Sequence, residues 1–189
     1  MDISRYLAKS GEKVDLAQWP TACDVDIDKK KVKEELLDQT ITEMQDLQEK
    51  LFADNHYGLV IVLQAMDAAG KDGTVKHVFA RLNPAGVKVQ SFKKPSSEEL
   101  DHDYMWRINK ALPGRGEIGI FNRSHYEEVV VARIHNLIKS DGMPEELVRK
   151  DIWESRYRQI RDWERYLSEN GFPMVKIFLH LSKNEQKKR

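Results

Sequence analysis

The segment from Leu59 to Thr74 constrains the fold of this 189-residue chain more than any other. It opens with five consecutive apolar residues, 59–63, a run of strand length that is typical of a strand buried on both faces. A turn with the small residues 68–70 follows, and Lys71 begins a stretch with helical spacing. A buried strand that leads directly into a helix indicates an α/β fold with a parallel sheet.

Strands and helices continue to alternate along the rest of the chain. Apolar runs predict three further strands, at 87–92, 118–121 and 174–181. Periodicity and capping residues predict helices over 28–53, 71–82 and 97–111, and a long one from Pro144 to Asn170. We therefore predict a parallel sheet covered by helices on both faces. Residues 1–27 are predicted to form an extended N-terminal arm, which places the domain at 28–189.

Composition excludes several classes of function. The chain has 31 Lys and Arg residues and 31 Asp and Glu residues, so global basicity does not favour nucleic acid or a membrane as partner. The single cysteine, Cys23, excludes an internal disulfide framework and fits a reducing cytosol. No apolar run approaches the ~20 residues of a membrane span, and the first residues do not open a signal peptide. We expect a soluble, cytoplasmic protein.

The turn after the first strand is predicted to bind phosphate. Small residues let backbone N–H groups approach phosphate oxygens, and the helix N-terminus and Lys71 add positive charge. Compared with the pattern G-x-x-x-x-G-K-[ST], Ala65 replaces the first glycine and Asp72 replaces the hydroxyl residue. The predicted phosphate-binding residues of this segment are Ala68, Ala69, Gly70, Lys71, Asp72, Gly73 and Thr74.

Asp67 places a carboxylate inside a loop built for anions. Without a cation, this carboxylate would repel phosphate. A bridging Mg²⁺ removes the conflict because it binds carboxylate and phosphate oxygens together. The alternative is that Asp67 caps the helix at Gly70 and that no ligand binds. Asp67 is therefore the predicted metal ligand.

A second motif follows the predicted strand at 118–121. Ligands of a parallel sheet bind beyond the carboxyl ends of its strands, so Asn122 and Arg123 are expected beside the Asp67–Lys71 loop. The planar guanidinium of Arg123 can bind two phosphate oxygens at once. Asn122 is neutral at a position where an acidic residue usually orders Mg²⁺, so it can orient a ligand but adds no charge.

The residues after Arg123 complete this motif. Ser124 is a predicted N-cap for a helix that continues through 129–132, and Arg133, about two turns later, is predicted to bind phosphate. Of Glu127 and Glu128, one is expected to contact metal or ligand and the other to face solvent; Glu127 is assigned to the second motif. His125 is interpreted as a hydrogen-bonded structural residue, because a phosphate acceptor needs little help from a base.

These motifs, in this order, resemble the family-2 polyphosphate kinases of the P-loop kinase superfamily. The resemblance covers roughly residues 30–189. It rests on residues 64–73, 112–117 and 121–127, supported by 91–95, 106–107, 163–165 and 178–183. It implies a fold similar to thymidylate kinase and a homo-oligomer. It also implies reversible, Mg²⁺-dependent phosphoryl transfer between inorganic polyphosphate and a nucleotide, with Mn²⁺ as a possible substitute.

The resemblance also implies roles for single residues. Asp67 and Lys71 match the essential carboxylate and lysine of the family's loop, and Asn122–Arg123 match its second motif. Asp67, Lys71 and Arg123 are the predicted catalytic residues. Asn122 followed by His-Tyr-Glu is similar to members that accept AMP or both AMP and ADP, so the acceptor stays open among AMP, ADP, GMP and GDP.

The family also has a helical lid after the last strand. Ser182 is the predicted N-cap of the first lid helix, and the chain is expected to be truncated within that helix, near Arg189. Two other functions stay open from the sequence. One is an ATP-dependent nucleoside monophosphate kinase on the same fold, and the other is a non-catalytic P-loop module that binds a nucleotide.

Overall fold

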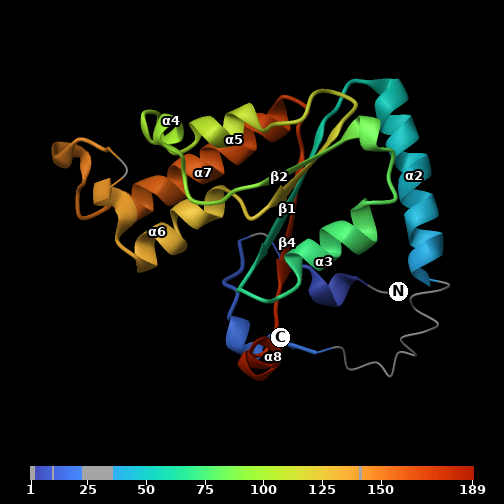
Figure 1. Cartoon of the computed structure of the whole chain (residues 1–189), viewed down its shortest axis with the longest axis horizontal. Coiled ribbons are helices and arrows are strands. Elements are labelled where there is room, and N and C mark those ends of the chain that lie inside the picture. The colour runs from blue at the N-terminus through green and yellow to red at the C-terminus, as the bar shows by residue number, and fades with distance from the viewer. Residues whose placement is uncertain (1–2, 10, 23–35, 141) are drawn as a thin grey trace.

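A computed structural model describes residues 3–9, 11–22, 36–140 and 142–189 of the chain. Its centre is a four-stranded parallel sheet with the strand order β2-β3-β1-β4 (Figure 1). The strands are β1 (Leu59–Ala65), β2 (Val87–Ser91), β3 (Ile118–Asn122) and β4 (Met174–Leu179). The four strands predicted from apolar runs are all present, and the parallel α/β fold is confirmed.

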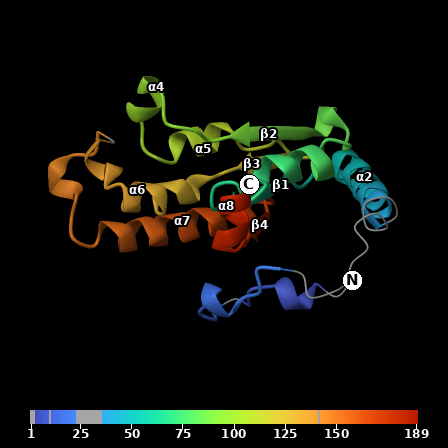
Figure 2. The same ribbon diagram turned by 60° about the horizontal axis from the view of Figure 1, so that its bottom comes forward.

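Successive side chains of the two central strands enter two different cores. Val60 and Val62 of β1 pack with Phe121 on one face of the sheet, whereas Ile61 and Leu63 pack on the other. This alternation follows from the two-residue repeat of a strand. Both central strands are buried because each face carries its own layer of helices, as Figures 1 and 2 show.

Different segments of the chain form the two helical layers. One contains α2 (Leu37–Asp54) and α3 (Lys71–Thr74), which a π-helical turn extends to Phe79. The other contains α5 (Trp106–Lys110) and α7 (Ile152–Glu169). The remaining helices are α4 (Ser97–Leu100), α6 (Val131–Ile134) and α8 (Lys183–Lys188). Single turns of 3-10 helix lie at Ser4–Tyr6, Leu16–Gln18, Pro84–Gly86, His125–Glu128, Leu137–Ser140 and Glu145–Leu147.

The prediction of one helix over 97–111 is wrong. The segment forms two short helices, α4 and α5, with a break between them. At the break, the side chain of Asp103 accepts a hydrogen bond from the backbone N–H of Met105 at 2.9 Å. A local bond of this kind competes with the helical pattern, and sequence periodicity does not reveal it.

Two other helices are also interrupted. The helix predicted from Pro144 begins only at Ile152, because Val148 has a ψ of 72°, outside the helical range. Ser124 does cap a helical turn, as predicted, by accepting a hydrogen bond from the N–H of Tyr126 at 3.2 Å. That turn ends at Glu128, and α6 starts separately at Val131.

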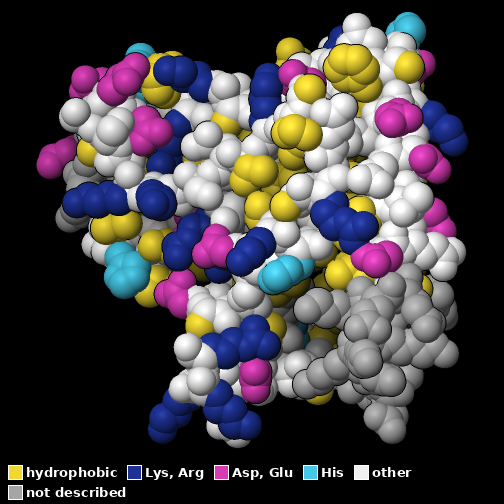
Figure 3. Space-filling view, turned by 45° about the vertical axis from the view of Figure 1, so that its right-hand side comes forward, with side chains coloured by type: hydrophobic (Ala, Val, Ile, Leu, Met, Phe, Trp, Pro, Cys, Tyr) yellow, Lys and Arg dark blue, Asp and Glu magenta, His cyan; other side chains and the backbone are white. Residues whose placement is uncertain are grey.

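The described part of the predicted N-terminal arm, 3–9 and 11–22, has two single turns of 3-10 helix as its only regular elements. The predicted start of the first helix at 28 lies outside the described residues. No helix in the described part of the chain is long and apolar enough to cross a membrane. Figure 3 shows basic and acidic side chains interspersed on one face, with Lys and Arg side chains at its lower end, where α8 lies.

Candidate active site

A cavity of 670 Å³ opens where the carboxyl ends of β1, β2 and β3 meet. The strand register brings the two predicted motifs together here, because Leu63 of β1 pairs with Asn122 of β3. The backbone N–H of Arg123 then donates to the carbonyl of Leu63 at 3.1 Å. The cavity is lined by Asp67, Ala68, Ala69, Gly70, Lys71, Asp72, Ser91, Phe92, Lys93, Lys94, Asn122, Arg123 and Arg189.

The loop between β1 and α3 wraps around the ammonium group of Lys71. Ala68 and Gly70 have φ angles of 59° and 99°, in the left-handed region that turns the chain back on itself. Lys71 is 8% exposed, and its Nζ donates to the carbonyls of Ala65 and Met66 at 3.0 and 3.2 Å. The ammonium therefore sits inside the loop, where it donates to backbone oxygens that a phosphate oxygen can replace.

The charge of Lys71 is sensitive to its neighbours. Burial lowers the pKa of this lysine most, and the guanidinium of Arg123 lowers it further. The carboxylates of Asp67, Glu127 and Asp72 act in the opposite direction. A bound phosphate would add to this second group, because an anion close to an ammonium group favours its charged form.

Arg123 links the loop to the segment after β3. Its guanidinium lies 3.2 Å from an oxygen of Asp67 and 3.7 Å from an oxygen of Glu127. Glu127 in turn accepts a hydrogen bond from the amide of Gln64 at 2.6 Å. The exposed fractions decide which of these groups a ligand can reach: Asp67 is 90% exposed, Arg123 43% and Glu127 14%.

Asp72 and Asn122 form a second link between the motifs. The amide of Asn122 donates to the carboxylate of Asp72, which occupies the place of the usual Ser or Thr. The hydroxyl of Thr74 donates to the carbonyl of Gly70 at 3.1 Å, within its own helix. Gly73 and Thr74 therefore lie in α3, near the cavity but not in its lining.

The structure does not bring Arg133 to this cavity. The side chain lies on α6 and donates to the hydroxyl of Tyr157 on α7 at 2.8 Å. The sequence places it two helical turns after Ser124, but the interruption at 129–130 changes its position.

The cavity contains three further basic residues, of which Lys93 and Lys94 belong to the segment 91–95 that supports the family resemblance. Lys93 and Lys94 line it just after β2. A signal for them exists, since they follow a strand whose carboxyl end faces the same edge of a parallel sheet. Arg189 lines it from α8, and a Cβ added at Gly70 would lie 3.4 Å from its guanidinium. It lies at the end of the segment that the sequence predicts to be the first lid helix.

A partly buried hydrogen-bond network packs against the segment after Arg123. The carboxylate of Glu164 accepts hydrogen bonds from Tyr126 and Lys176, both at 2.6 Å, and lies 3.2 Å from His125 Nε2. Burial alone would raise the pKa of Glu164, but its three hydrogen-bond partners together lower it to about 2. His125 is completely buried, in agreement with its predicted structural role.

The acidic residues of the cavity fit a magnesium ion that the substrates help to hold. No three His, Cys, Asp or Glu side chains in the described ranges are arranged as a complete metal site. Asp67 nevertheless extends an exposed carboxylate into a cavity that is otherwise mostly cationic. Mg²⁺ is commonly bound by one or two carboxylates together with substrate phosphates and water, and this chain offers such a partial set.

Comparison with known proteins identifies the family. The family model described as "Polyphosphate kinase 2 (PPK2)" matches residues 26–189. The chain belongs to the polyphosphate kinase 2 family. It is 49% identical over 187 residues to the ADP-polyphosphate phosphotransferase of Rhodopseudomonas palustris, and 47% identical over 146 residues to the AMP/ADP-polyphosphate phosphotransferase of Meiothermus ruber.

A solved member of the polyphosphate kinase 2 family has the same fold. The crystal structure of polyphosphate kinase 2 from Arthrobacter aurescens TC1 matches 96% of this chain with a TM-score of 0.79 and 39% identity. The alignments cover 98% and 77% of this chain for the two curated relatives. The chain spans 65% and 51% of the lengths of those relatives, and 62% of the solved chain.

Proposed function

We propose that this protein catalyses reversible, Mg²⁺-dependent phosphoryl transfer between inorganic polyphosphate and a nucleoside mono- or diphosphate, AMP, ADP, GMP or GDP. The observation that carries the proposal is the cavity at the carboxyl edge of the sheet. Five basic side chains line it together with two carboxylates, which suits two polyanions with a metal between them. Relatives named ADP-, AMP/ADP- and GDP-polyphosphate phosphotransferases support the substrate classes.

The reaction exchanges one phosphoanhydride bond for another. A terminal oxygen of the acceptor nucleotide attacks the end phosphorus of polyphosphate, and the bond to the next phosphate breaks. The shortened chain leaves with the electron pair of that bond. The attacking oxygen is already deprotonated near neutral pH, so no general base is required, and catalysis consists of positioning and charge stabilisation.

The basic residues of the loop and the second motif would perform this stabilisation. Lys71 and the N–H groups of residues 68–70 would bind the phosphoryl group during transfer, in place of the present contacts of Lys71 with backbone oxygens. Arg123 would neutralise charge on the same group. Asn122, fixed by Asp72, would orient the acceptor, and Glu127 would keep Arg123 in position.

Asp67 would hold the magnesium ion, and the carboxylate of Glu127 lies on the other side of Arg123, 3.7 Å from its guanidinium. When bound, Mg²⁺ neutralises charge on bridging phosphate oxygens and lowers their mutual repulsion. Asp67 pairs with Arg123 at 3.2 Å, and both side chains are exposed enough for either to contact a bound phosphate or cation.

The test is a matrix of nucleotides against phosphate donors. The purified protein is incubated with Mg²⁺ and AMP, ADP, GMP or GDP, and with either polyphosphate or ATP as donor. Product formed from polyphosphate without ATP is expected, and the reverse reaction should lengthen polyphosphate from a nucleoside triphosphate. Turnover with ATP and a monophosphate only would identify a nucleoside monophosphate kinase instead. Tight nucleotide binding without turnover under any condition would identify a non-catalytic module.

A further inference from the structure

Arg123 has an unusual backbone conformation. Its φ is 66°, in the left-handed region, where residues with a Cβ are uncommon. Of the four such non-glycine residues in the described ranges, two are asparagines and one is Ala68, so Arg123 is the one with a long side chain. A residue stays in this region only where the surrounding structure holds it there. The contacts on both sides of Arg123 therefore determine where its guanidinium points.

The chain before Arg123 is fixed by the sheet, but the chain after it is not. At the end of β3, the backbone N–H of Arg123 donates to the carbonyl of Leu63 at 3.1 Å. After Ser124 comes the single 3-10 turn His125–Glu128. One turn of this kind makes too few hydrogen bonds to keep its position alone. Contacts from other elements must therefore fix it.

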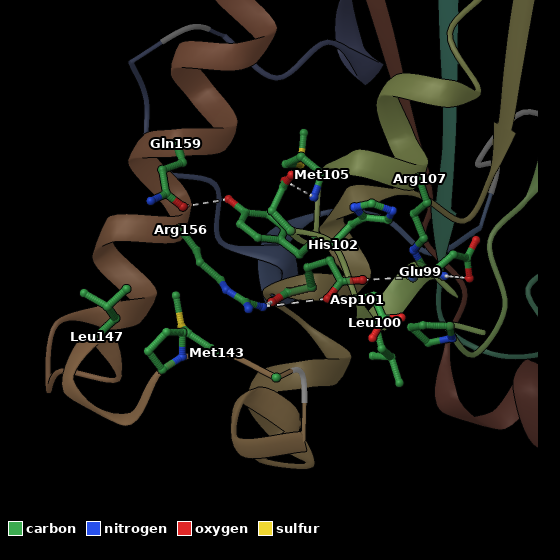
Figure 4. Close-up of a pocket in the computed structure, with 16 residues that line it drawn as sticks. Glu99, Leu100, Asp101, His102, Met105, Arg107, Met143, Leu147, Arg156 and Gln159 are labelled. Atoms are coloured by element: carbon green, nitrogen blue, oxygen red, sulfur yellow. Dashed lines mark hydrogen bonds and ion pairs between the residues drawn. The ribbon is translucent and has the colours of Figure 1, made fainter. Parts of the chain in front are cut away.

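The far end of this turn is fixed by a buried carboxylate. Glu128 lies 2.9 Å from the guanidinium of Arg107 and 3.7 Å from that of Arg156. Figure 4 shows both arginines beside a separate pocket, Arg107 on α5 and Arg156 on α7. Glu128 is several residues away from Arg123 in the sequence, so this contact does not by itself fix the near end of the turn.

The near end is held by Glu164 of α7. Its Oε1 accepts a hydrogen bond from the hydroxyl of Tyr126 at 2.6 Å and lies 3.2 Å from Nε2 of His125. The ring of His125 is completely buried, and its Nδ1 has no hydrogen-bond partner among the described residues. We propose that Glu164 is a positioning residue, which acts through this segment to keep the guanidinium of Arg123 in the 670 Å³ phosphate cavity. The inference rests on the proposed function, in which Arg123 binds the transferring phosphoryl group.

The two oxygens of Glu164 serve different elements. Oε1 contacts the turn after Arg123, whereas Oε2 accepts a hydrogen bond from Lys176 of β4 at 2.6 Å. The side chain of Lys176 is 47% exposed, so water can replace this contact, but the buried ring of His125 has no such alternative. The pKa of Glu164 is lowered to about 2, so the carboxylate is charged at neutral pH and both oxygens accept. The position of Arg123 therefore depends on Oε1.

Two substitutions of Glu164 test this division. Glu164→Gln keeps one carbonyl oxygen, which His125 and Tyr126 can share as they share Oε1, so turnover should stay within about threefold of wild type. Glu164→Leu removes both oxygens, and turnover should fall about tenfold or more, because a displacement of ~1 Å in an active site can cost about 10²-fold. A loss in the Gln variant as large as in the Leu variant would overturn the role of Oε1.

Two further variants are controls. Lys176→Met removes the partner of Oε2 and leaves the contacts of Oε1 with His125 and Tyr126 in place. Glu169→Leu makes the same change as Glu164→Leu at an exposed position of the same helix. Both should change turnover by less than about threefold, since neither acts on the segment after Arg123.

A double-mutant cycle shows whether Glu164 acts through Arg123. In the Arg123→Gln background, Glu164→Leu should cause no further loss of turnover, because the side chain that it positions is gone. A general loss of structure would instead lower turnover by the same factor in both backgrounds, and that result would overturn the inference. Urea unfolding identifies the variants that are folded in the assay. Tyr126→Phe removes one contact of Oε1 and keeps the ring, so it carries the cycle if Glu164→Leu does not fold.

The same cycle in phosphate binding separates this inference from the proposed function. Calorimetric titration with tripolyphosphate requires no turnover. Glu164→Leu should weaken its binding by about threefold or more when Arg123 is present and should have no effect in Arg123→Gln. Coupled binding in a protein without turnover would contradict the proposed function alone. Normal turnover with independent effects of the two substitutions would overturn the positioning role alone.

Discussion

Two arginine–carboxylate pairs at the same edge of the sheet differ in how firmly they are held. Arg123 and Asp67 lie 3.2 Å apart, and their side chains are 43% and 90% exposed. Arg107 and Glu128 lie 2.9 Å apart, and their side chains are only 9% and 11% exposed. An exposed ion pair contributes little to stability and exchanges partners easily. Removal of one partner of a buried ion pair lowers the stability of the protein strongly. The first pair is therefore suited to ligand binding. The second holds the segment after β2 beside the cavity, because Arg107 also donates to the carbonyl of Lys93 at 2.7 Å.

The largest effect is expected in the buried pair. Glu128→Leu would remove a carboxylate that lies 2.9 Å from the buried guanidinium of Arg107 and 3.7 Å from that of Arg156. Breaking a buried ion pair from one side typically costs about 3–5 kcal/mol of stability. Urea unfolding measures the loss. Glu185→Ala, which breaks an exposed pair with Arg189, is the control and should cost less than about 1 kcal/mol. Equal losses in the two variants would remove the distinction between the pairs.

Lys71→Met should act on activity instead of stability. The ammonium group contacts two backbone oxygens of its own loop, so the core loses little when the group is removed. Removal of one preorganised charge contact to a transferring group typically lowers turnover by about 10²–10³-fold. Steady-state kinetics and urea unfolding on the same preparation check both parts. Turnover within a few fold of wild type would contradict the phosphate loop.

Asp67→Asn tests the exposed pair of Asp67 and Arg123. The amide keeps the size of the side chain but not the charge that Mg²⁺ requires, so turnover should fall on the order of 10²-fold. Without metal, the affinity of the Asn variant for tripolyphosphate should stay unchanged or increase, because the carboxylate that repels the anion is gone. Glu43→Gln, a substitution on α2, is a control of equal charge change. Wild-type activity and Mg²⁺ dependence in Asp67→Asn would contradict the proposed role of Asp67 as a metal ligand; the start of α3 has no side-chain cap that Asp67 could provide instead.

Sequence reasoning succeeds where one local rule decides the structure. The buried run at 59–63 predicts β1, and the end of a parallel strand predicts that Asn122 and Arg123 lie beside the loop; both residues line the cavity with Asp67 and Lys71. The prediction of helices from apolar periodicity fails where a side chain or a backbone angle interrupts the helix locally. The Asp103 turn and the ψ angle of Val148 interrupt two predicted helices without any change in apolar periodicity.

Contacts between distant segments are the other limit of the sequence. Arg189 reaches the cavity only through the path of β4 and α8, and Arg107 forms its pair with a residue 21 positions away. Such contacts depend on tertiary packing, which cannot be read from the composition or the spacing of residues along the chain.

The network around Glu164 predicts a moderate dependence of stability on acid. Its pKa is lowered to about 2 in the folded protein, below the ordinary value of 4.5. The unfolded chain therefore binds a proton first as the pH falls, so this contribution is full above about pH 5 and is lost toward pH 2. We expect a loss on the order of 2 kcal/mol in this window. Glu164→Gln should flatten the stability curve there, and an equally steep curve in this variant would assign the acid sensitivity to other groups.

The smallest effect is expected at Arg133, which makes it the sharpest comparison with Arg123. Both arginines follow the same strand and carry the same charge, but only Arg123 lines the phosphate cavity. Arg133 donates to the hydroxyl of Tyr157, a single hydrogen bond worth about 0.5–1.5 kcal/mol of stability. Arg133→Gln should therefore change turnover by less than about threefold, whereas Arg123→Gln should lower it by about 10²-fold. Steady-state kinetics of both variants over a range of polyphosphate concentrations test this comparison. A comparable loss of turnover in both variants, with a raised KM for polyphosphate, would show that Arg133 reaches the phosphates during the reaction.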